Sequence, residues 1–370
     1  MKKVLLGTSA IVLAATSAQA AEWDVRVGGY HNQFIGFASS DIKNSTADVD
    51  GVDVKQNAEI FFLPSITLDN GIKFGANVQL ESGGATQTPD TIDESYMYIR
   101  GSFGEINLGS ENSAGYKMHY AAPNRAIIGF NSPSTPVFIP WSGGGAGNGL
   151  FRSTLSSTYI ENSRNNDADR ITYYTPRFAG FQLGVSYARD GSQDNNTQQD
   201  ISDASGNLHD IFDVGANYVN DFGGVNVAVS ARWGIATQEN GAGVASTNPT
   251  VLGFGANVGF GGFTIGGSWA EQNDGGNTDG QAFDIGVAYD TGPWGFSAMW
   301  FHGENVDDDL GFATGQDEEQ DTFGIGINYK LAKGVRLNAF AAYVDFDEKV
   351  ATGDTDVDGF VIGTGVGLSF

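Results

Sequence analysis

The segment Ile72-Lys73-Phe74-Gly75-Ala76-Asn77-Val78-Gln79-Leu80 decides the fold class of this chain. Apolar residues take every second position, and the positions between them hold polar residues or glycine. A β-strand that buries one face only has this period of two. The same alternation returns in residues 225–233, 323–330, 335–343 and 360–370. The sequence therefore predicts an all-β protein.

Composition narrows the class of protein further. The chain has 370 residues, with 53 Gly, 12% aromatic residues, no Cys, and 19 basic against 44 acidic residues, a net charge of −25. The aromatic content is too high for a disordered acidic chain. The lack of Cys excludes disulfides, thiolate metal sites and cysteine nucleophiles. The acidic balance argues against a nucleic-acid partner, because no basic stripe is present to neutralise phosphates.

The N-terminus has the pattern of a secretory signal peptide, residues 1–20. Two lysines precede an apolar stretch, and Ala18-Gln19-Ala20 is a small-residue cleavage site, so we expect cleavage between Ala20 and Ala21. The alternative, an N-terminal membrane anchor, is disfavoured because the apolar stretch is too short to span about 30 Å of hydrocarbon. The mature chain, residues 21–370, would be a single β-barrel domain with 17 basic and 44 acidic residues, net −27.

Turn signals divide the mature chain into strands. Seven tight turns, of which Asp69-Asn70-Gly71 is typical, alternate with eight longer connections. Fifteen connections predict sixteen strands, near 23–37, 53–68, 72–82, 92–100, 104–110, 169–175, 181–190, 209–220, 225–236, 249–260, 263–272, 281–289, 294–304, 320–330, 335–347 and 357–370. One rim of the sheet would carry tight turns and the other long loops. This arrangement is typical of a transmembrane antiparallel β-barrel with short periplasmic turns and long external loops.

The polar face of these strands indicates which kind of barrel forms. It includes Lys73, Asn77, Gln79, Ser230 and Arg232, which would be costly in a dry core. Sixteen strands close into a tube too wide for side chains to fill, so these groups suit a water-filled lumen. A closed barrel also leaves no unpaired strand edge in lipid. The alternative is a soluble β-sandwich or β-helix with the polar face outside.

Three segments resemble the Gram-negative general porins. They are the terminal strand Gly365-Val366-Gly367-Leu368-Ser369-Phe370, the strand–turn–strand at 169–184, and the turn and strand at 102–110. The resemblance implies an outer-membrane barrel in lipid and lipopolysaccharide, usually a homotrimer, that passes ions and small hydrophilic solutes by passive diffusion. It implies that the third external loop, residues 111–168, folds inward and narrows the lumen. It also implies that Phe370 is a barrel-assembly signal.

The same resemblance places charged residues at the pore constriction, with bases on the wall facing acids on the loop. The wall candidates are Arg26, Lys73, Arg100 and Arg170. The loop candidates are Glu111, Lys117, Arg125, Arg152, Glu161 and Asp167. This loop is not clearly acidic, and Ser110 stands where the family often has Arg, so the match is partial. The alternative for each residue is a wetted charge with no special role.

Acidic residues concentrate in two external connections. Residues 305–321 hold seven acids and no base, and residues 345–358 hold six acids against Lys349. Such carboxylates could loosely hold Ca²⁺ or Mg²⁺ that bridge to lipid phosphates. The alternative is a solvated acidic rim. We expect no resident cofactor, and the overall charge suggests a preference for cations.

Signals for an enzyme are poor. None of the four His stands in a metal-binding spacing, and the chain has no G-x-S-x-G motif and no P-loop. A passive diffusion channel is therefore the main hypothesis. Two others remain open: a solute-selective porin with a sugar path along Tyr96, Tyr98 and Tyr116, and an adhesive surface barrel acting through loops 305–319 and 348–356.

Overall fold

A computed structural model describes residues 22–43, 50–82, 92–131, 138–139, 153–161, 166–193, 208–238, 248–273, 279–306, 317–348 and 356–370. These residues form sixteen antiparallel strands. The first eight are β1 (Asp24–Ile42), β2 (Gly51–Thr67), β3 (Lys73–Ser82), β4 (Ser95–Gly101), β5 (Gly104–Ser110), β6 (Asp169–Tyr174), β7 (Phe181–Asp190) and β8 (Leu208–Asp221). The others are β9 (Asn226–Gln238), β10 (Thr250–Phe260), β11 (Phe263–Asn273), β12 (Gly280–Thr291), β13 (Trp294–Val306), β14 (Asp317–Ala332), β15 (Val335–Glu348) and β16 (Val357–Ser369).

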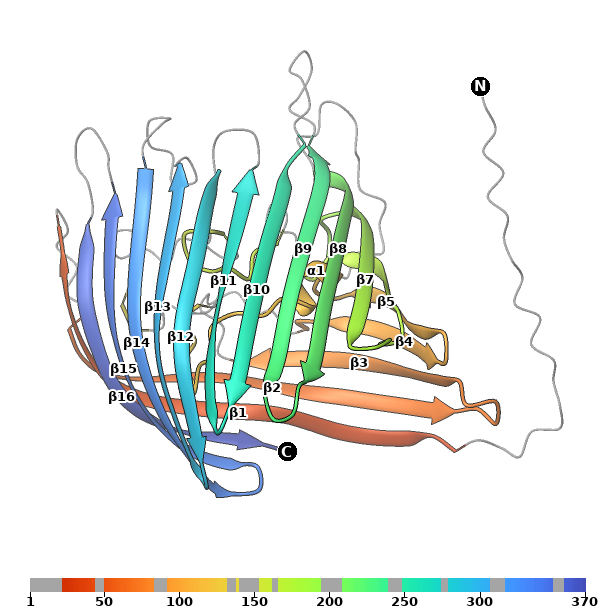
Figure 1. The fold of residues 1–370 in the computed structure, drawn as a ribbon, viewed down its shortest axis with the longest axis horizontal. Helices are drawn as coiled ribbons and strands as arrows, with labels where there is room; N and C mark the ends of the chain where they lie inside the picture. The colour runs from red at the N-terminus through yellow and green to blue at the C-terminus, as the bar shows by residue number, and fades with distance from the viewer. Residues whose placement is uncertain are drawn as a thin grey trace, which may run out of the picture.

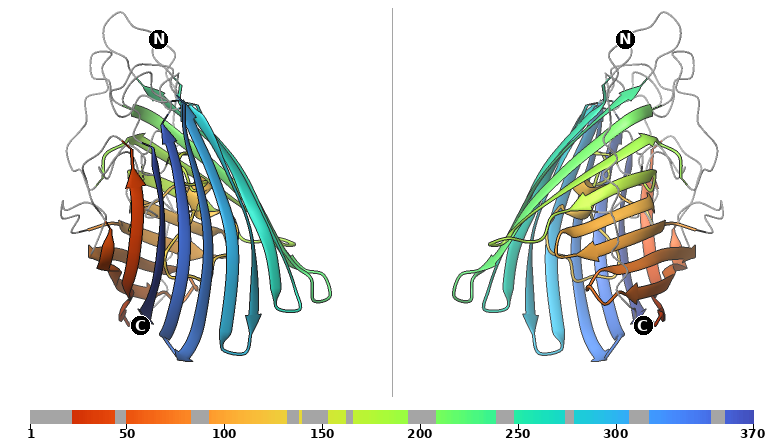
Figure 2. Two further views of the ribbon diagram at one scale, coloured as in Figure 1. Left: turned by 90° about the vertical axis from the view of Figure 1, so that its left-hand side faces the viewer. Right: turned by 90° about the vertical axis from the view of Figure 1, so that its right-hand side faces the viewer.

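Each strand pairs with its neighbours in the sequence, and the first strand closes the sheet by pairing with the last. Phe34 of β1 lies opposite Lys55 of β2 on one side and Gly365 of β16 on the other. Figure 2 shows β1 and β16 side by side at this seam. The predicted all-β class, strand number and closed antiparallel barrel are confirmed.

Most strand boundaries agree with the sequence prediction within a few residues, and β1 differs most. Its predicted end is residue 37, but it continues to Ile42. Pairing with β16 goes on to Ile42 opposite Val357, and Ala38 and Ile42 are buried. The alternation in this stretch is weak, because Ser39, Ser40 and Asp41 are all polar, which is why the sequence alone places the end too early.

The two rims of the barrel differ as expected. The strand ends that tight turns join lie at one end of the barrel, and the strand ends that long connections join lie at the other, as Figure 1 shows for β8 to β14. At the β2–β3 turn, Gly71 has φ +80°, a left-handed conformation that glycine adopts without a steric penalty. For a barrel of this type, the rim with tight turns is the periplasmic one.

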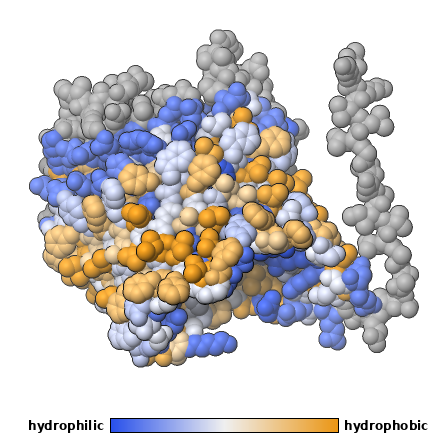
Figure 3. Space-filling model, in the orientation of Figure 1, coloured by the Kyte–Doolittle hydropathy of each residue, from blue (hydrophilic) through white to orange (hydrophobic). Residues whose placement is uncertain are grey.

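Apolar side chains point outward along the strands. On β10, Phe254 and Val258 are about half exposed, while Gly253, Gly255 and Asn257 alternate with them on the inner face. Figure 3 shows the resulting apolar band across the outer surface, with hydrophilic residues toward the external rim. Such a band suits contact with lipid, and a polar inner face suits a water-filled lumen.

The third external loop (L3, residues 111–168) enters the barrel. Three of its described parts matter here: an outgoing leg (111–131), two residues near the tip (138–139) and a return leg (153–161). The outgoing leg contains the one-turn helix α1 (Ala114–Lys117), which contacts β6 to β9 and lies inside the barrel in Figure 1. In the described part of the chain, no helix is long and apolar enough to cross a membrane.

Candidate functional site: the channel constriction

The outgoing leg of L3 is bound to the inner wall through its backbone. Four backbone N–H groups spaced along the leg each donate to a wall side chain: Ala114 to Ser186 Oγ (2.7 Å), Tyr120 to Ser230 Oγ (2.9 Å), Ala122 to the Asp284 carboxylate (3.1 and 3.2 Å) and Arg125 to Ser297 Oγ (2.8 Å). These acceptors belong to β7, β9, β12 and β13. A loop buried in this way needs partners for its backbone, and the wall supplies them in place of regular secondary structure.

Glycines on the wall make room for this leg. A Cβ at Gly215 would lie 2.7 Å from the carbonyl oxygen of Ala114, and one at Gly255 would overlap the carbonyl oxygen of Tyr120. A Cβ at Gly326 would overlap the backbone of L3 in the same way. Glycine within a strand marks a close approach of another backbone. Part of the glycine excess in the sequence therefore lets the backbone of L3 pack closely on the inner wall.

Arg125 clamps the leg to three strands at once. Its guanidinium donates to both carboxylate oxygens of Asp290 on β12, at 2.6 to 3.2 Å. Its backbone N–H binds Ser297 on β13, and its carbonyl oxygen accepts a hydrogen bond of 3.2 Å from Asn328 on β14. A planar guanidinium that binds a carboxylate through two nitrogens fixes direction as well as distance.

Beyond the clamp, L3 forms a hydrophobic core with the wall. Ile128, Phe130, Phe138 and Ile139 are buried against wall side chains of β1, β13, β15 and β16. The ring of Phe138 lies 6.0 Å from that of Phe340. The apolar residues of L3 that the structure describes thus pack on the inner wall.

The return leg runs along the same wall nearer the external rim. Leu155 and Ile160 are fully buried, and Arg232 donates to the carbonyl oxygen of Ile160. The leg is then joined to the outgoing leg by Glu161, whose carboxylate accepts hydrogen bonds from Ser113 N (3.0 Å) and Ser113 Oγ (2.8 Å). L3 is thus a two-layered lining held closed at its base.

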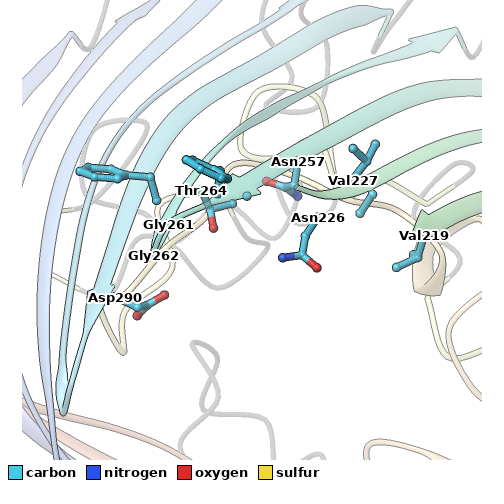
Figure 4. Close-up of a pocket in the computed structure, with 12 residues that line it drawn as sticks. Val219, Asn226, Val227, Asn257, Gly261, Gly262, Thr264 and Asp290 are labelled. Carbon is cyan, nitrogen blue, oxygen red and sulfur yellow. The ribbon is translucent and has the colours of Figure 1, made fainter. Parts of the chain in front are cut away.

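This lining leaves one part of the inner wall open. The described parts of L3 cover β6 to β16 and the external half of β1 (the covered wall). The inner face of β2 to β4 (the open wall) keeps half-buried polar side chains. At the periplasmic mouth, below L3, the inner face has a recess of about 380 Å³ that includes Asn226, Asn257, Thr264 and Asp290. Figure 4 shows these polar groups around the recess.

The four predicted wall bases do not gather at one level. Arg26, Lys73 and Arg100 lie at the periplasmic ends of β1, β3 and β4, and Arg170 lies at the opposite end of β6. Arg26 is exposed and 3.2 Å from the Asp24 carboxylate. Lys73 and Arg100 are register partners. Arg170 is buried at the base of L3, where its Nε donates to the Ala168 carbonyl oxygen at 3.2 Å.

The loop candidates mostly hold L3 together. Lys117 Nζ donates to Glu111 Oε2 at 2.7 Å, and this carboxylate also accepts from Asn107. Burial alone would lower the pKa of Lys117, but the Glu111 carboxylate outweighs it, so the pKa lies above its usual value. Asp167 is buried with φ +53°, and Arg152 lies outside the described residues.

One histidine is buried in the lining. His119 lies edge-to-face against Tyr159, with ring centroids 4.9 Å apart. Burial, and then the charge of Arg232, lower the pKa of His119 to about 3. The imidazole is therefore neutral at any ordinary pH.

Sequence reasoning missed the carboxylates of the open wall, Glu59, Glu81, Asp93 and Glu94. Glu59 and Glu81 are register partners on the inner faces of β2 and β3. Their pairing was available from the sequence, because both stand the same number of residues from the Asp69-Asn70-Gly71 turn. Asp93 and Glu94 were missed because the sequence prediction places both within the fourth strand, whereas β4 starts at Ser95.

Two other predicted features lie at the ends of the strands. Phe370 exchanges backbone hydrogen bonds with Gly29 at 3.0 and 3.1 Å, and its assembly role stays a prediction. Residues 307–316 and 349–355 of the acidic connections lie outside the described residues, as do Ala20 and Ala21. Among the residues that the structure does describe, no group of three or more His, Asp or Glu is placed to hold a metal ion.

Comparison with known proteins finds four curated relatives, two of which illustrate the range of the match. An uncharacterized protein of Rickettsia bellii is 25% identical over 223 residues, which are 52% of this chain and 49% of the relative. Outer membrane porin protein 32 of Delftia acidovorans is 24% identical over 270 residues, 70% of this chain and 67% of the relative. The match thus spans about half the length of the first relative and about two thirds of the second.

Solved structures share the fold at low sequence identity. The outer membrane channel DcaP of Acinetobacter baumannii has a TM-score of 0.62 at 14% identity, covering 97% of this chain and all of DcaP. The anion-selective porin of Comamonas acidovorans has 0.58 at 18%, covering 94% of this chain and 100% of that porin. The trimer form of OmpT, an outer membrane protein of Vibrio cholerae, has 0.59 at 14%, covering 94% and 99%.

The family assignment comes from the sequence itself. The profile described as Gram-negative porin matches residues 7–349, which is most of the chain. The closed sixteen-stranded barrel, its apolar outer band and its inward-folded third loop agree with that profile. The chain therefore belongs to the Gram-negative porin family.

Proposed function

We propose that ions and small hydrophilic solutes diffuse passively through this chain, in the passage between L3 and the open wall. One observation carries the proposal: L3 is bound to the covered wall, while polar side chains of β2 to β4, such as Asn57 and Gln79, stay half-buried. A hydrated, polar passage lets solutes cross without losing their water. We infer that the chain acts as a channel and not as an enzyme.

Substituted cysteines in planar bilayers test this path, because the natural chain contains no Cys. In Asn57→Cys, on the inner face of β2, a bulky water-soluble thiol reagent should lower the single-channel conductance. In Val214→Cys, on the outer face of β8, the same reagent should leave it unchanged. Full conductance in the modified Asn57→Cys protein, or absence of channels from the unmodified protein, would refute the proposed path.

A specific sugar path has less support from the geometry. Of the three tyrosines expected to form it, Tyr98 is 6% exposed, beneath Arg100, whose guanidinium carbon lies 4.1 Å from the ring centroid. Tyr96 is covered in part by Lys117, whose Nζ lies 4.8 Å from its ring centroid. Occupied ring faces do not stack on sugars. The general channel is therefore the better proposal.

A homotrimer is the second part of the proposal, supported by polar groups on the outer face of β1 to β3. His31, Gln33 and Gln56 lie there, and Gln33 and Gln56 are direct register partners. Gln56 Nε2 donates to Ser82 Oγ at 3.3 Å. Polar side chains at mid-height on a lipid-facing surface are costly. A second copy packed on this face would remove them from lipid.

Cross-linking tests the interface. Gln33→Cys should form cross-linked copies with a short thiol-reactive cross-linker in native membranes. Ile265→Cys, which lies on the outer face of β11 and is 59% exposed, should give monomers only. Equal cross-linking of both variants would refute an interface on β1 to β3.

Two predictions from the sequence extend the proposal beyond the described residues. Removal of residues 1–20 would place Ala21 at the mature N-terminus, which mass spectrometry of the membrane protein measures. Loosely bound Ca²⁺ or Mg²⁺ at the acidic connections would lower thermal stability on chelation. An unchanged melting temperature in chelator would leave a solvated acidic rim as the role of these residues.

A further inference from the structure

Carboxylates face each other across the open wall. Glu59 on β2 and Glu81 on β3 are directly opposite on the inner face, and Asp93 and Glu94 precede β4 beside them. The backbone N–H of Asp93 donates to the carbonyl oxygen of Gln79 on β3, which fixes these two acids against that strand. Like charges directly opposite each other in a sheet lower its stability. Their presence here therefore calls for a role other than stability.

Neutral groups hold two of these carboxylates. Tyr30 donates its hydroxyl to Glu59 Oε1 at 2.5 Å. Gln79 Nε2 and Asn112 Nδ2 each donate to Glu94 at 2.7 Å. Hydrogen bonds of this kind keep a carboxylate in place. Glu94 is buried, whereas Glu59 is only half-buried and lies beside the passage. The open wall thus presents fixed negative charge to the passing solute.

Three bases beside the passage, Lys117, Arg100 and Lys55, give an independent observation. Each has an acid of its own on one side and an aromatic ring on the other. The three sets are Lys117 with Glu111 and the Tyr96 ring, Arg100 with Glu105 and the Tyr98 ring, and Lys55 with Asp53 and the Phe138 ring. The nitrogen or guanidinium carbon lies 4.1 to 6.0 Å from the ring centroid in these sets.

These sets have two consequences. The positive charges of these three bases are locally neutralised, so they do little to attract anions. These three sets also indicate which surroundings stabilise an ammonium or guanidinium group in this lumen. Each cation lies near both a carboxylate and the face of an aromatic ring. Glu59 offers the same pair of surfaces to a solute, because the rings of Tyr30 and Phe61 adjoin it, 6.2 Å apart between centroids.

We propose that the passage between L3 and the open wall selects cations over anions, with Glu59 and Glu81 as its main determinants and small ammonium solutes as its best-held ligands. The proposal rests on the proposed diffusion channel. It gives this chain the opposite selectivity to the anion-selective porin of Comamonas acidovorans, which shares its fold. A narrow path lined by one sign of charge concentrates the opposite ions.

Reversal potentials in a KCl gradient test the proposal, with a matched pair of variants. Glu59→Gln with Glu81→Gln removes a facing carboxylate pair from the inner surface. Asp345→Asn with Asp358→Asn removes another facing pair, between β15 and β16, from the outer surface. We expect a K⁺ to Cl⁻ permeability ratio above one, lowered about two-fold or more by the inner pair because close charges act strongly at low ionic strength, and unchanged by the outer pair.

The ligand arm uses butylammonium chloride on the same channels. Butylammonium should reduce the K⁺ current saturably in the natural protein and in the outer-pair variant, and far less in the inner-pair variant. A permeability ratio of one or below, or equal effects of the two variant pairs, would overturn the selectivity while leaving the diffusion channel intact. A protein that inserts but conducts no ions would overturn both.

Discussion

The covered wall and the open wall are built from the same kind of strand and differ in what their polar groups face. On the covered wall, hydroxyls and carboxylates of β7, β9, β12 and β13 accept hydrogen bonds from the L3 backbone, and glycines bring that backbone close. On the open wall, Glu59 and Glu81 face the passage. Serine and glycine on an inner face thus indicate a seat for a loop, and opposed carboxylates indicate a path for solute.

The largest expected effect is on the packing of L3 against the inner wall. Gly255→Ala places a Cβ against the Tyr120 carbonyl oxygen, a backbone atom that cannot rotate away. Overpacking of this kind costs about 1–3 kcal/mol. The free energy of unfolding, measured by urea titration in lipid vesicles, should fall by this amount, and L3 should shift toward the barrel axis and lower the conductance.

The same strand and face offer the control for this comparison. At Gly259, four residues along β10, the nearest atoms to a Cβ would be 3.5 Å away, which is ordinary contact. Gly259→Ala should change the free energy of unfolding by no more than about 0.5 kcal/mol. Equal effects of the two substitutions would show that L3 does not rest on β10.

The hydrogen bonds that join the two legs of L3 should come next in size. Ser113→Ala removes a donor to Glu161, a contact between two fully buried side chains, and an acceptor for the half-buried Tyr116 N. Leaving a buried carboxylate oxygen short of a partner costs about 1–3 kcal/mol. Ser102→Ala, exposed in the turn between β4 and β5, is the control and should cost less than about 0.5 kcal/mol. A similar loss in both would mean that Glu161 finds another donor.

The Arg125 clamp should have a smaller effect on stability and a clear effect on current. The side chains of Arg125 and Asp290 are 24% and 41% exposed, so solvent screens their attraction and the pair contributes about 1 kcal/mol or less. Arg125→Ala should nevertheless let the outgoing leg move and raise the open-channel noise. Arg26→Ala, which breaks an exposed pair away from L3, should leave the noise unchanged.

These two walls also differ in how far the sequence predicted them. Strict alternation predicts which residues of every strand face inward, so the lumen position of Lys73, Arg100 and Arg170 followed from the sequence. The contacts of each inward residue depend on the path of L3 through the barrel. The sequence of L3 has no regular alternation of polar and apolar residues from which that path could be predicted. Arg170 therefore lies buried at the base of L3 instead of on the open passage, and Arg125, expected at a constriction, is a clamp.

The last prediction concerns one carboxyl of the open wall. Burial, and then the charges of Asp167, Glu59, Glu81 and Glu94, raise the pKa of Asp93 to about 8. These four carboxylates come from L3, β2, β3 and the approach to β4, and Gln193 donates to the Asp93 carbonyl oxygen at 2.6 Å. Asp93 is therefore protonated at pH 6 and ionised at pH 9.5.

Because Asp93 gains its charge inside this range, the K⁺ to Cl⁻ permeability ratio should rise with a midpoint near pH 8. The rise should be modest, since one charge joins several. The free energy of unfolding should change in the opposite direction. Folding raises the pKa of Asp93, so the folded protein binds more protons than the unfolded chain, and its free energy of unfolding falls as pH rises from the ordinary pKa of an aspartate toward 8. Asp93→Asn should remove both trends, whereas Asp358→Asn on the outer surface should keep them. A permeability ratio that stays flat from pH 6 to 9.5 in the natural protein would place Asp93 outside the path of the ions.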